Sequence, residues 1–258
     1  MGCVTYDFSG KTVLVTGASR GIGYAVAEGF VRAGAHTFIM ASGDGVYSAA
    51  EKLKKVGDVI ALQCDITDSA SVAGALAEIG HLDVLINNAG LERITPLSDP
   101  DSTVEDTFRR IIDINVNGTF LVTRHAQAKM KSGGRIILTG SIWSHTAVAE
   151  FSAYCASKHA NLGFMRSVAH ELGPKGITVN AVCPGWVKTE AAMLSLHKMS
   201  EGSGRSENDL LEEITGAQVL EGLLEPQDMA ALYLFLASDE AKDITGQSYN
   251  LDRGEVMG

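Results

Sequence analysis

Short runs of consecutive hydrophobic residues alternate along the chain with longer stretches in which hydrophobic residues recur every three or four positions. The first run, Lys11–Thr16, predicts a buried β-strand, and the next stretch, Gly21–Ala33, predicts a helix with an apolar face. The same pattern predicts further strands at Thr37–Met40, Val59–Cys64, Asp83–Ile86, Arg135–Leu138, Thr178–Val182 and Ser248–Leu251. It predicts further helices at Ser48–Lys55, Ser69–Ile79, Thr103–Lys131, Phe151–Leu172 and Pro226–Leu236.

The order of these elements predicts the class of fold. Strands that are hydrophobic throughout are typical of parallel sheets covered on both faces, and regular alternation of strand and helix indicates a doubly wound sheet. We therefore expect one α/β domain over residues 1–258, with about seven parallel strands and helices on both faces. Residues 190–225 break the pattern with the stretch EGSGRSEND at 201–209, which we interpret as a mobile substrate lid or, alternatively, a plain surface loop.

Composition narrows the range of partners. The chain is 45% hydrophobic, and its formal net charge of −10 argues against nucleic acid as a partner, because phosphate binding needs clustered Lys and Arg. No run approaches the length of a membrane span and residues 1–10 lack a signal-peptide pattern, so we expect a cytoplasmic protein. No metal site is expected either. Reduced thiols are expected at Cys3, Cys64, Cys155 and Cys183, which lack disulfide or zinc-site spacing.

The turn after the first strand carries the first chemical signal. Residues 16–23 read TGASRGIG, between a predicted strand and a predicted helix. Gly17 permits a sharp turn, while Gly21 and Gly23 leave room where the backbone approaches a pyrophosphate and where helix meets sheet. Because a helix N-terminus presents free N–H groups to phosphate, this turn predicts a dinucleotide site.

Three further motifs follow in order: NNAG at 87–90, YCASK at 154–158 and PG at 184–185. Together with the TGxxxGxG spacing of the first turn, they resemble the short-chain dehydrogenase/reductase family over nearly the whole chain. The resemblance implies a Rossmann-like fold, a nicotinamide cofactor and hydride transfer between an alcohol and a carbonyl group. It also implies cofactor contacts from Gly17, Ser19, Arg20, Gly21, Ile22, Gly23, Ser42, Asp65, Ile66, Asn88, Ala89, Gly90, Tyr154, Lys158, Pro184, Gly185, Val187 and Thr189.

The choice between NAD and NADP rests on the end of the second strand. Ala41 stands where NAD-using members often carry an acidic residue, and Ser42 where NADP-using members often carry Arg. Arg20 offers a fork of donors to a 2′-phosphate or is a solvated turn residue, whereas Asp44 would favour NAD if its loop folds inward. We expect NAD(P)(H), with a preference for NADP(H) because Ala41 is not acidic.

The predicted chemistry centres on Tyr154. Carbonyl reduction needs a proton donor at the substrate oxygen, and Tyr154 shares a helical face with Lys158, four residues later. We expect the Lys158 ammonium and the positive nicotinamide ring to lower the pKa of Tyr154. Ser141 is expected to hold the substrate oxygen. By resemblance, Asn115 holds a water that links Lys158 to solvent.

The substrate is expected over the carboxyl ends of the strands. The predicted contacts are Arg93, Trp143, Glu150 and Trp186, and Glu92 and His145 add further charge to the same loops. These side chains suit a hydroxylated or anionic substrate, or a ring that stacks on tryptophan. They do not identify the substrate.

Two other functions fit the same residues. One is a 3-oxoacyl carrier-protein reductase, although the acidic balance does not favour a basic carrier entrance. The other is a cofactor-binding regulator or scaffold without activity, which the four residues of the predicted catalytic set argue against. The family resemblance also implies a homotetramer formed through Thr103–Lys131, Phe151–Leu172 and the tail, in which Arg253 departs from a common glycine.

Overall fold

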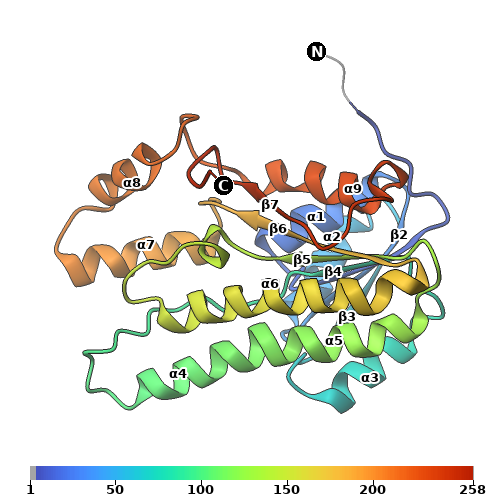
Figure 1. Ribbon diagram of the computed structural model, residues 1–258, viewed down its shortest axis with the longest axis horizontal. Coiled ribbons are helices and arrows are strands. Elements are labelled where there is room, and N and C mark those ends of the chain that lie inside the picture. Colours follow the sequence, from blue (N-terminus) through green and yellow to red (C-terminus); the bar gives the residue numbers. More distant parts are fainter. Residues whose placement is uncertain (1–3, 258) are drawn as a thin grey trace.

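Residues 4–257, which this computed structural model describes, form one parallel sheet of seven strands in the order β3-β2-β1-β4-β5-β6-β7 (Figure 1). The strands are β1 (Thr12–Thr16), β2 (His36–Ala41), β3 (Val59–Gln63), β4 (Val84–Asn87), β5 (Arg135–Thr139), β6 (Thr178–Pro184) and β7 (Ser248–Leu251). The strand order reverses between β1 and β4, which opens a crevice at the carboxyl ends of the strands. The predicted doubly wound sheet is confirmed.

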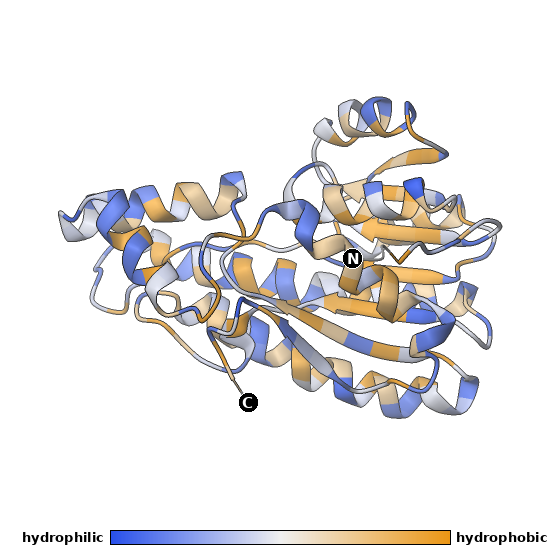
Figure 2. Ribbon diagram, turned by 90° about the horizontal axis from the view of Figure 1, so that it is seen from above, coloured by the Kyte–Doolittle hydropathy of each residue, from blue (hydrophilic) through white to orange (hydrophobic). Residues whose placement is uncertain are grey.

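Helices cover both faces of this sheet and enclose two hydrophobic cores. The helices are α1 (Gly21–Arg32), α2 (Gly45–Leu53), α3 (Ser69–Ala77), α4 (Thr103–Ile112), α5 (Thr119–Ala126), α6 (Ser152–Leu172), α7 (Glu190–Ser203), α8 (Glu207–Gly216) and α9 (Ala230–Ala237). One core lies beneath α1, α2 and α9, and the other beneath α3, α5 and α6. Figure 2 shows that the strands are mostly hydrophobic and that the helices carry both hydrophobic and hydrophilic residues. No helix within residues 4–257 has the length and hydropathy of a membrane span.

The helix expected at Thr103–Lys131 is not one regular α-helix. A π-helical turn at Asp113–Gly118 separates α4 from α5, and a 3-10 turn, Gln127–Lys129, ends the stretch. The π-turn coincides with Asn115, whose buried side chain binds the backbone of Leu91 and whose carbonyl accepts a hydrogen bond from Thr119 Oγ1 at 2.8 Å. Contacts with a distant loop therefore distort a helix that the local pattern predicts to be regular.

Residues 190–225 also differ from the expected irregular segment, because they contain the helices α7 and α8. Gly204, with φ of 68°, ends α7, and the Ser206 side chain caps α8 by accepting the N–H of Asp209 at 3.1 Å. The stretch EGSGRSEND is thus a helix end followed by a helix start. Sequence reasoning missed both helices because Gly, Ser and Asp serve as caps as well as loop residues.

The apolar face of α6 packs on the sheet. Leu162, Met165 and Val168 are buried in the core beneath α6, so they do not form an exposed surface for assembly. The tail holds a second local feature: Arg253 has φ of 58°, a conformation that favours glycine. Its guanidinium donates to the carbonyls of Glu221 (2.7 Å) and Leu223 (3.1 Å), which ties the tail to the segment after α8.

The cysteines in the described part of the chain are Cys64, Cys155 and Cys183, all buried and free, while Cys3 lies outside it.

Candidate active site

The turn between β1 and α1 is packed against the NNAG segment so closely that side chains do not fit at two glycines. A Cβ atom on Gly17, where φ is 66°, would lie 2.7 Å from the Cα of Ala89. A Cβ atom on Gly23 would lie 2.4 Å from Asn88 Nδ2 and 2.5 Å from the carbonyl oxygen of Gly17. Gly23 therefore serves close packing of helix against strand end, as the sequence predicts.

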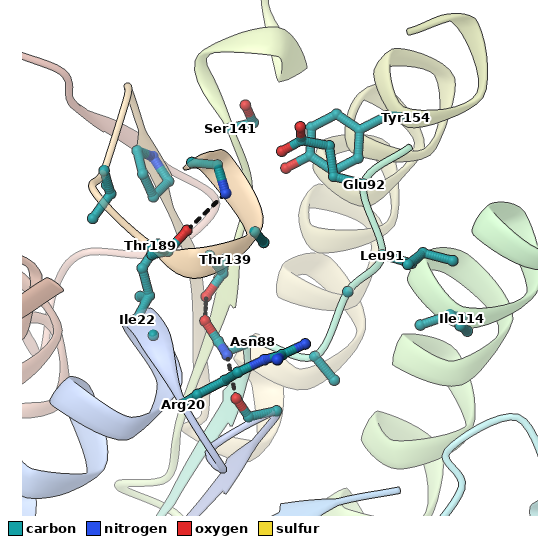
Figure 3. Close-up of a pocket in the computed structure, with 18 of the residues that line it drawn as sticks. Arg20, Ile22, Asn88, Leu91, Glu92, Ile114, Thr139, Ser141, Tyr154 and Thr189 are labelled. Carbon is teal, nitrogen blue, oxygen red and sulfur yellow. Dashed lines mark hydrogen bonds between the residues drawn. The ribbon is translucent and has the colours of Figure 1, made fainter. Parts of the chain in front are cut away.

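Hydrogen bonds join the carboxyl ends of β1, β4 and β5 (Figure 3). Asn88 donates from Nδ2 to the carbonyls of Thr16 at 3.0 Å and Gly17 at 3.3 Å, and accepts at Oδ1 from the Thr139 hydroxyl at 3.2 Å. The Thr16 hydroxyl accepts the N–H groups of Asn88 and Ala89, each at 3.0 Å. Thr139 also forms a hydrogen bond with the Tyr233 hydroxyl at 2.7 Å. Thr139 therefore fixes this edge of the sheet, although it is not among the residues predicted from the sequence.

A cavity of about 440 Å³ runs along this edge. Its lining includes the predicted residues Gly17, Ser19, Arg20, Gly21, Ile22, Ser42, Asp65, Ile66, Asn88, Ala89, Gly90, Ser141, Trp143, Tyr154, Lys158, Pro184, Gly185, Trp186, Val187 and Thr189. Gly23, as packing residue, and Asn115 lie outside the lining. The glycine-bounded turn, the helix N-terminus and a lining that reaches from the end of β2 to α6 fit a dinucleotide, which these residues would hold with the pyrophosphate at α1.

The β2 end of the cavity carries the residues expected to choose the cofactor. Ala41 and Ser42 line it, whereas Asp44 lies outside the lining and precedes α2 as an exposed residue. Arg20 lines the cavity, and its guanidinium pairs with the carboxylate of Glu190 at 3.1 Å, with both side chains exposed. Asp44 therefore does not take the inward position that would favour NAD.

Asp65 lies at the same end, after β3. Its carboxylate accepts hydrogen bonds from the Thr67 backbone at 3.0 Å and hydroxyl at 2.8 Å, and these bonds lower the pKa of Asp65. Arg110, 3.6 Å away, adds to the lowering. Asp65 is thus fixed as a charged acceptor beside the cavity.

At the other end, α6 places Tyr154 and Lys158 together. The ammonium of Lys158 lies 5.4 Å from the centre of the Tyr154 ring and donates to the carbonyl of Thr139 at 2.7 Å. Burial lowers the pKa of Lys158 from its usual 10.5 to about 8, although the charges of Cys183 and Glu92 oppose the change. Trp143 packs its ring edge-on to Tyr154, with centres 5.8 Å apart.

The protein's own groups do not lower the pKa of Tyr154. Burial raises this pKa, the negative charge of Glu92 raises it further, and a hydrogen bond with Ser141 lowers it in part. The lowering expected from Lys158 is not found, because desolvation disfavours the phenolate and raises the pKa instead. Of the two groups expected to lower the pKa of Tyr154, only the positively charged nicotinamide ring remains.

Asn115 supports the site from behind. Its Oδ1 accepts the N–H of Leu91 at 2.7 Å, and its Nδ2 donates to the carbonyl of Leu91 at 3.0 Å and to the Ser157 hydroxyl at 2.9 Å. The amide thus holds the NNAG loop against α6. Its predicted role in holding a water stays a prediction.

The four predicted substrate residues separate into two groups. Trp143 and Trp186 line the cavity. Arg93 and Glu150 do not: Arg93 turns its guanidinium to the carbonyl of Glu92 at 2.6 Å, and Glu150 is exposed. Glu92, beside Arg93, lines the cavity instead. The charged pair Glu92-Arg93 after NNAG indicated a substrate contact in the sequence. Successive residues of an extended segment point to opposite sides, however, and only the fold shows which of the two faces the cavity.

Comparison with known proteins agrees with this site. The family model described as enoyl-(acyl carrier protein) reductase matches residues 17–255. A 3-oxoacyl-[acyl-carrier-protein] reductase of Salmonella typhimurium is 36% identical over 97% of this chain and 99% of its own. A putative NAD(P)-dependent gluconate 5-dehydrogenase of Beutenbergia cavernae, solved with NADP, is 31% identical with a TM-score of 0.87, covering 98% of this chain and 99% of its own. L-sorbose reductase of Gluconobacter frateurii, solved with NADPH and L-sorbose, is 25% identical with a TM-score of 0.88, covering 98% of both chains.

Fold, dinucleotide turn and relatives together define an NAD(P)-dependent oxidoreductase. The chain belongs to the short-chain dehydrogenase/reductase family, as its motifs indicate.

Proposed function

We propose that this enzyme interconverts a secondary alcohol, or a sugar hydroxyl, and the corresponding carbonyl compound, with Tyr154 as the general acid and base. The observation that carries the proposal is the convergence of Ser141, Tyr154 and Lys158 at one end of a cavity whose other end is the glycine turn. When bound, the nicotinamide cofactor supplies or accepts the hydride. In reduction Tyr154 gives its proton to the substrate oxygen, and in oxidation it takes the proton back.

Three neighbouring side chains support the proton transfer by Tyr154. Ser141 donates to the substrate oxygen and holds it beside Tyr154. Lys158, with a pKa of about 8, exchanges its proton near neutral pH and supports the phenolate when charged. Asn115 keeps the loop at Leu91 in place, so that the cavity wall beside Lys158 is fixed.

NADP(H) is the preferred cofactor in this proposal. Ala41 and Ser42 present no negative charge to a 2′-phosphate, and Arg20 is the cation at the turn. Both solved structures described above hold NADP or NADPH, which supports the same choice.

A 3-oxoacyl carrier-protein reductase remains the second candidate, because a relative of that name is 36% identical. A regulator without activity is disfavoured by the assembled Ser141, Tyr154 and Lys158.

We also propose a homotetramer in the cytoplasm. Phe120 on α5 is exposed and packs edge-on to Phe164 of α6, which supports an interface along these helices, and the buried free thiols suit a reducing compartment.

The test follows absorbance at 340 nm while purified protein meets NADP⁺ or NAD⁺ with sugars, polyols, hydroxy acids and aromatic alcohols, and the reduced cofactors with the matching carbonyl compounds. We expect Tyr154→Phe to lower turnover by about 10²- to 10⁴-fold, because the phenolic proton is lost. Tyr47→Phe, an exposed tyrosine on α2, is the matched control.

Cofactor binding is measured separately by intrinsic fluorescence, because both tryptophans of the chain, Trp143 and Trp186, line the cavity. Binding with no turnover across the whole set would favour the regulator. Turnover that survives in Tyr154→Phe would reject Tyr154 as the acid and base.

A further inference from the structure

We propose that Glu92 determines substrate specificity by accepting a hydrogen bond from a hydroxyl group next to the reacting carbon. The substrate class is then a neutral vicinal diol and its α-hydroxy ketone, and substrates with a carboxylate at that position are rejected. This inference rests on the proposed function, since it assigns the reacting carbon to the space beside Tyr154.

Position is the first argument. Glu92 lies two residues beyond the NNAG motif and lines the cavity together with Ser141 and Tyr154. Figure 3 shows its carboxylate on the side of the pocket where the Tyr154 ring lies, below Ser141. The two side chains are close enough for the charge of Glu92 to raise the pKa of Tyr154. A substrate oxygen held by Ser141 and Tyr154 therefore has the carboxylate of Glu92 as a near neighbour.

The second argument is the acceptor capacity of this carboxylate. Burial raises the pKa of Glu92, but a hydrogen bond from Ser195 of α7 and the charges of Lys158 and Arg93 oppose the change. A carboxylate offers about four lone-pair positions, and Ser195 uses one of them. A half-buried acceptor with free positions is well satisfied by a donor that the substrate brings.

The charges around Glu92 select the kind of donor. A substrate carboxylate would place a second negative charge beside that of the half-buried Glu92, which is unfavourable where the cavity wall lowers the effective dielectric constant. A substrate ammonium would meet the positive charges of Lys158 and Arg93, which already act on Glu92. A hydroxyl group donates to the carboxylate without either repulsion, so a neutral hydroxylated substrate fits best.

The experiment uses four probes with one ring and one reacting carbinol: trans-1,2-cyclohexanediol, trans-2-methylcyclohexanol, trans-2-aminocyclohexanol and trans-2-hydroxycyclohexanecarboxylate. We measure kcat/KM for each with wild type, Glu92→Gln and the control Glu171→Gln, an exposed acid on α6. We expect the wild type to prefer the diol. Glu92→Gln should lower kcat/KM for the diol by roughly 10-fold relative to the methyl probe, because the amide keeps an acceptor oxygen but loses the negative charge that strengthens the hydrogen bond. It should raise kcat/KM for the carboxylate probe relative to the methyl probe, which reports any effect that Glu92 has on all substrates through the pKa of Tyr154.

Opposite changes for two probes separate a role in specificity from damage to the fold, and thermal unfolding of Glu92→Gln checks the fold independently. The inference is overturned if the methyl, amino or carboxylate probe equals or exceeds the diol in wild type, or if Glu92→Gln leaves the ranking unchanged. It is also overturned if the enzyme oxidises other alcohols but not the diol. Failure of the proposed function looks different: no substrate of any class then gives turnover that Tyr154→Phe removes.

Discussion

Lys158 carries an ammonium group into the interior at the end of β5, where the Thr139 carbonyl is its hydrogen-bond acceptor at 2.7 Å. Because one acceptor replaces the full hydration of the ion, burial lowers the pKa of Lys158 to about 8. The same group is fully solvated in the unfolded chain, where its pKa is the usual 10.5. Between these two values the unfolded chain binds more protons than the folded one, so the stability of the protein rises with pH.

We predict that Lys158→Met removes this rise. From pH 8 to 10.5, the unfolding free energy of the wild type should increase relative to that of Lys158→Met by up to about 3 kcal/mol, since one pKa unit corresponds to about 1.4 kcal/mol. Urea unfolding of both proteins across this range, monitored by circular dichroism, measures the difference. Parallel curves for the two proteins would show that Lys158 titrates normally in the folded state.

At the scale of elements, the close meeting of α1 with the ends of β1 and β4 decides where the dinucleotide turn lies. Gly23 is the tightest point of this contact, because its missing side chain leaves space for the Gly17 carbonyl and the Asn88 amide. Some other helical glycines have no such role. Gly74, in α3, is exposed, and a Cβ atom there would meet nothing within 4 Å.

We predict that substitution by alanine has opposite effects on stability at these two glycines. Gly23→Ala should lower the free energy of unfolding by about 1–3 kcal/mol, because the methyl group forces backbone apart. Gly74→Ala should raise it by about 0.5–1 kcal/mol, because alanine loses less conformational entropy in a helix. Denaturant unfolding of both variants compares them directly. Equal changes in the free energy of unfolding would mean that the turn accommodates the methyl group at position 23 without strain.

At the scale of the whole molecule, the sheet gathers segments that lie far apart in the sequence. The turn after β1, the loop after β4, the region from the end of β5 into α6 and the start of α7 all line one cavity. The pair between Arg20 of the turn and Glu190 of α7 links two of these segments at the cofactor end. Both side chains are exposed, so this ion pair itself contributes little stability, and Arg20 is available to a bound phosphate.

Cofactor preference should therefore appear in the stability of the whole protein, since at equal concentration the ligand that binds more tightly stabilises the folded state more. We predict that NADPH raises the unfolding temperature more than NADH at equal concentration, and that Arg20→Ala removes most of this difference. Arg32→Ala, which removes an exposed arginine paired with Glu28, should keep it. A larger effect of NADH on the wild type would contradict the preference for NADP(H). The measurement is thermal unfolding monitored by circular dichroism.

The sequence by itself determined the sheet, the family, the glycine turn and the residues Ser141, Tyr154 and Lys158. These depend on local patterns: uniform hydrophobic runs give buried strands, and motifs fix spacing along one element. Cap residues stayed ambiguous, since the chemistry that ends α7 and begins α8 is also the chemistry of a loop.

The tertiary structure alone decided how distant segments act on these residues. It turned the regular helix around Asn115 into a π-helical turn, because the amide binds Leu91 from another loop. It placed Glu92 rather than Arg93 or Glu150 in the cavity. It also raised the pKa of Tyr154, mainly by burying the ring and in addition through the charge of Glu92, whereas the sequence alone predicts this pKa to fall. The pKa depends on burial and on the distance between charges, and neither quantity is defined until the chain has folded.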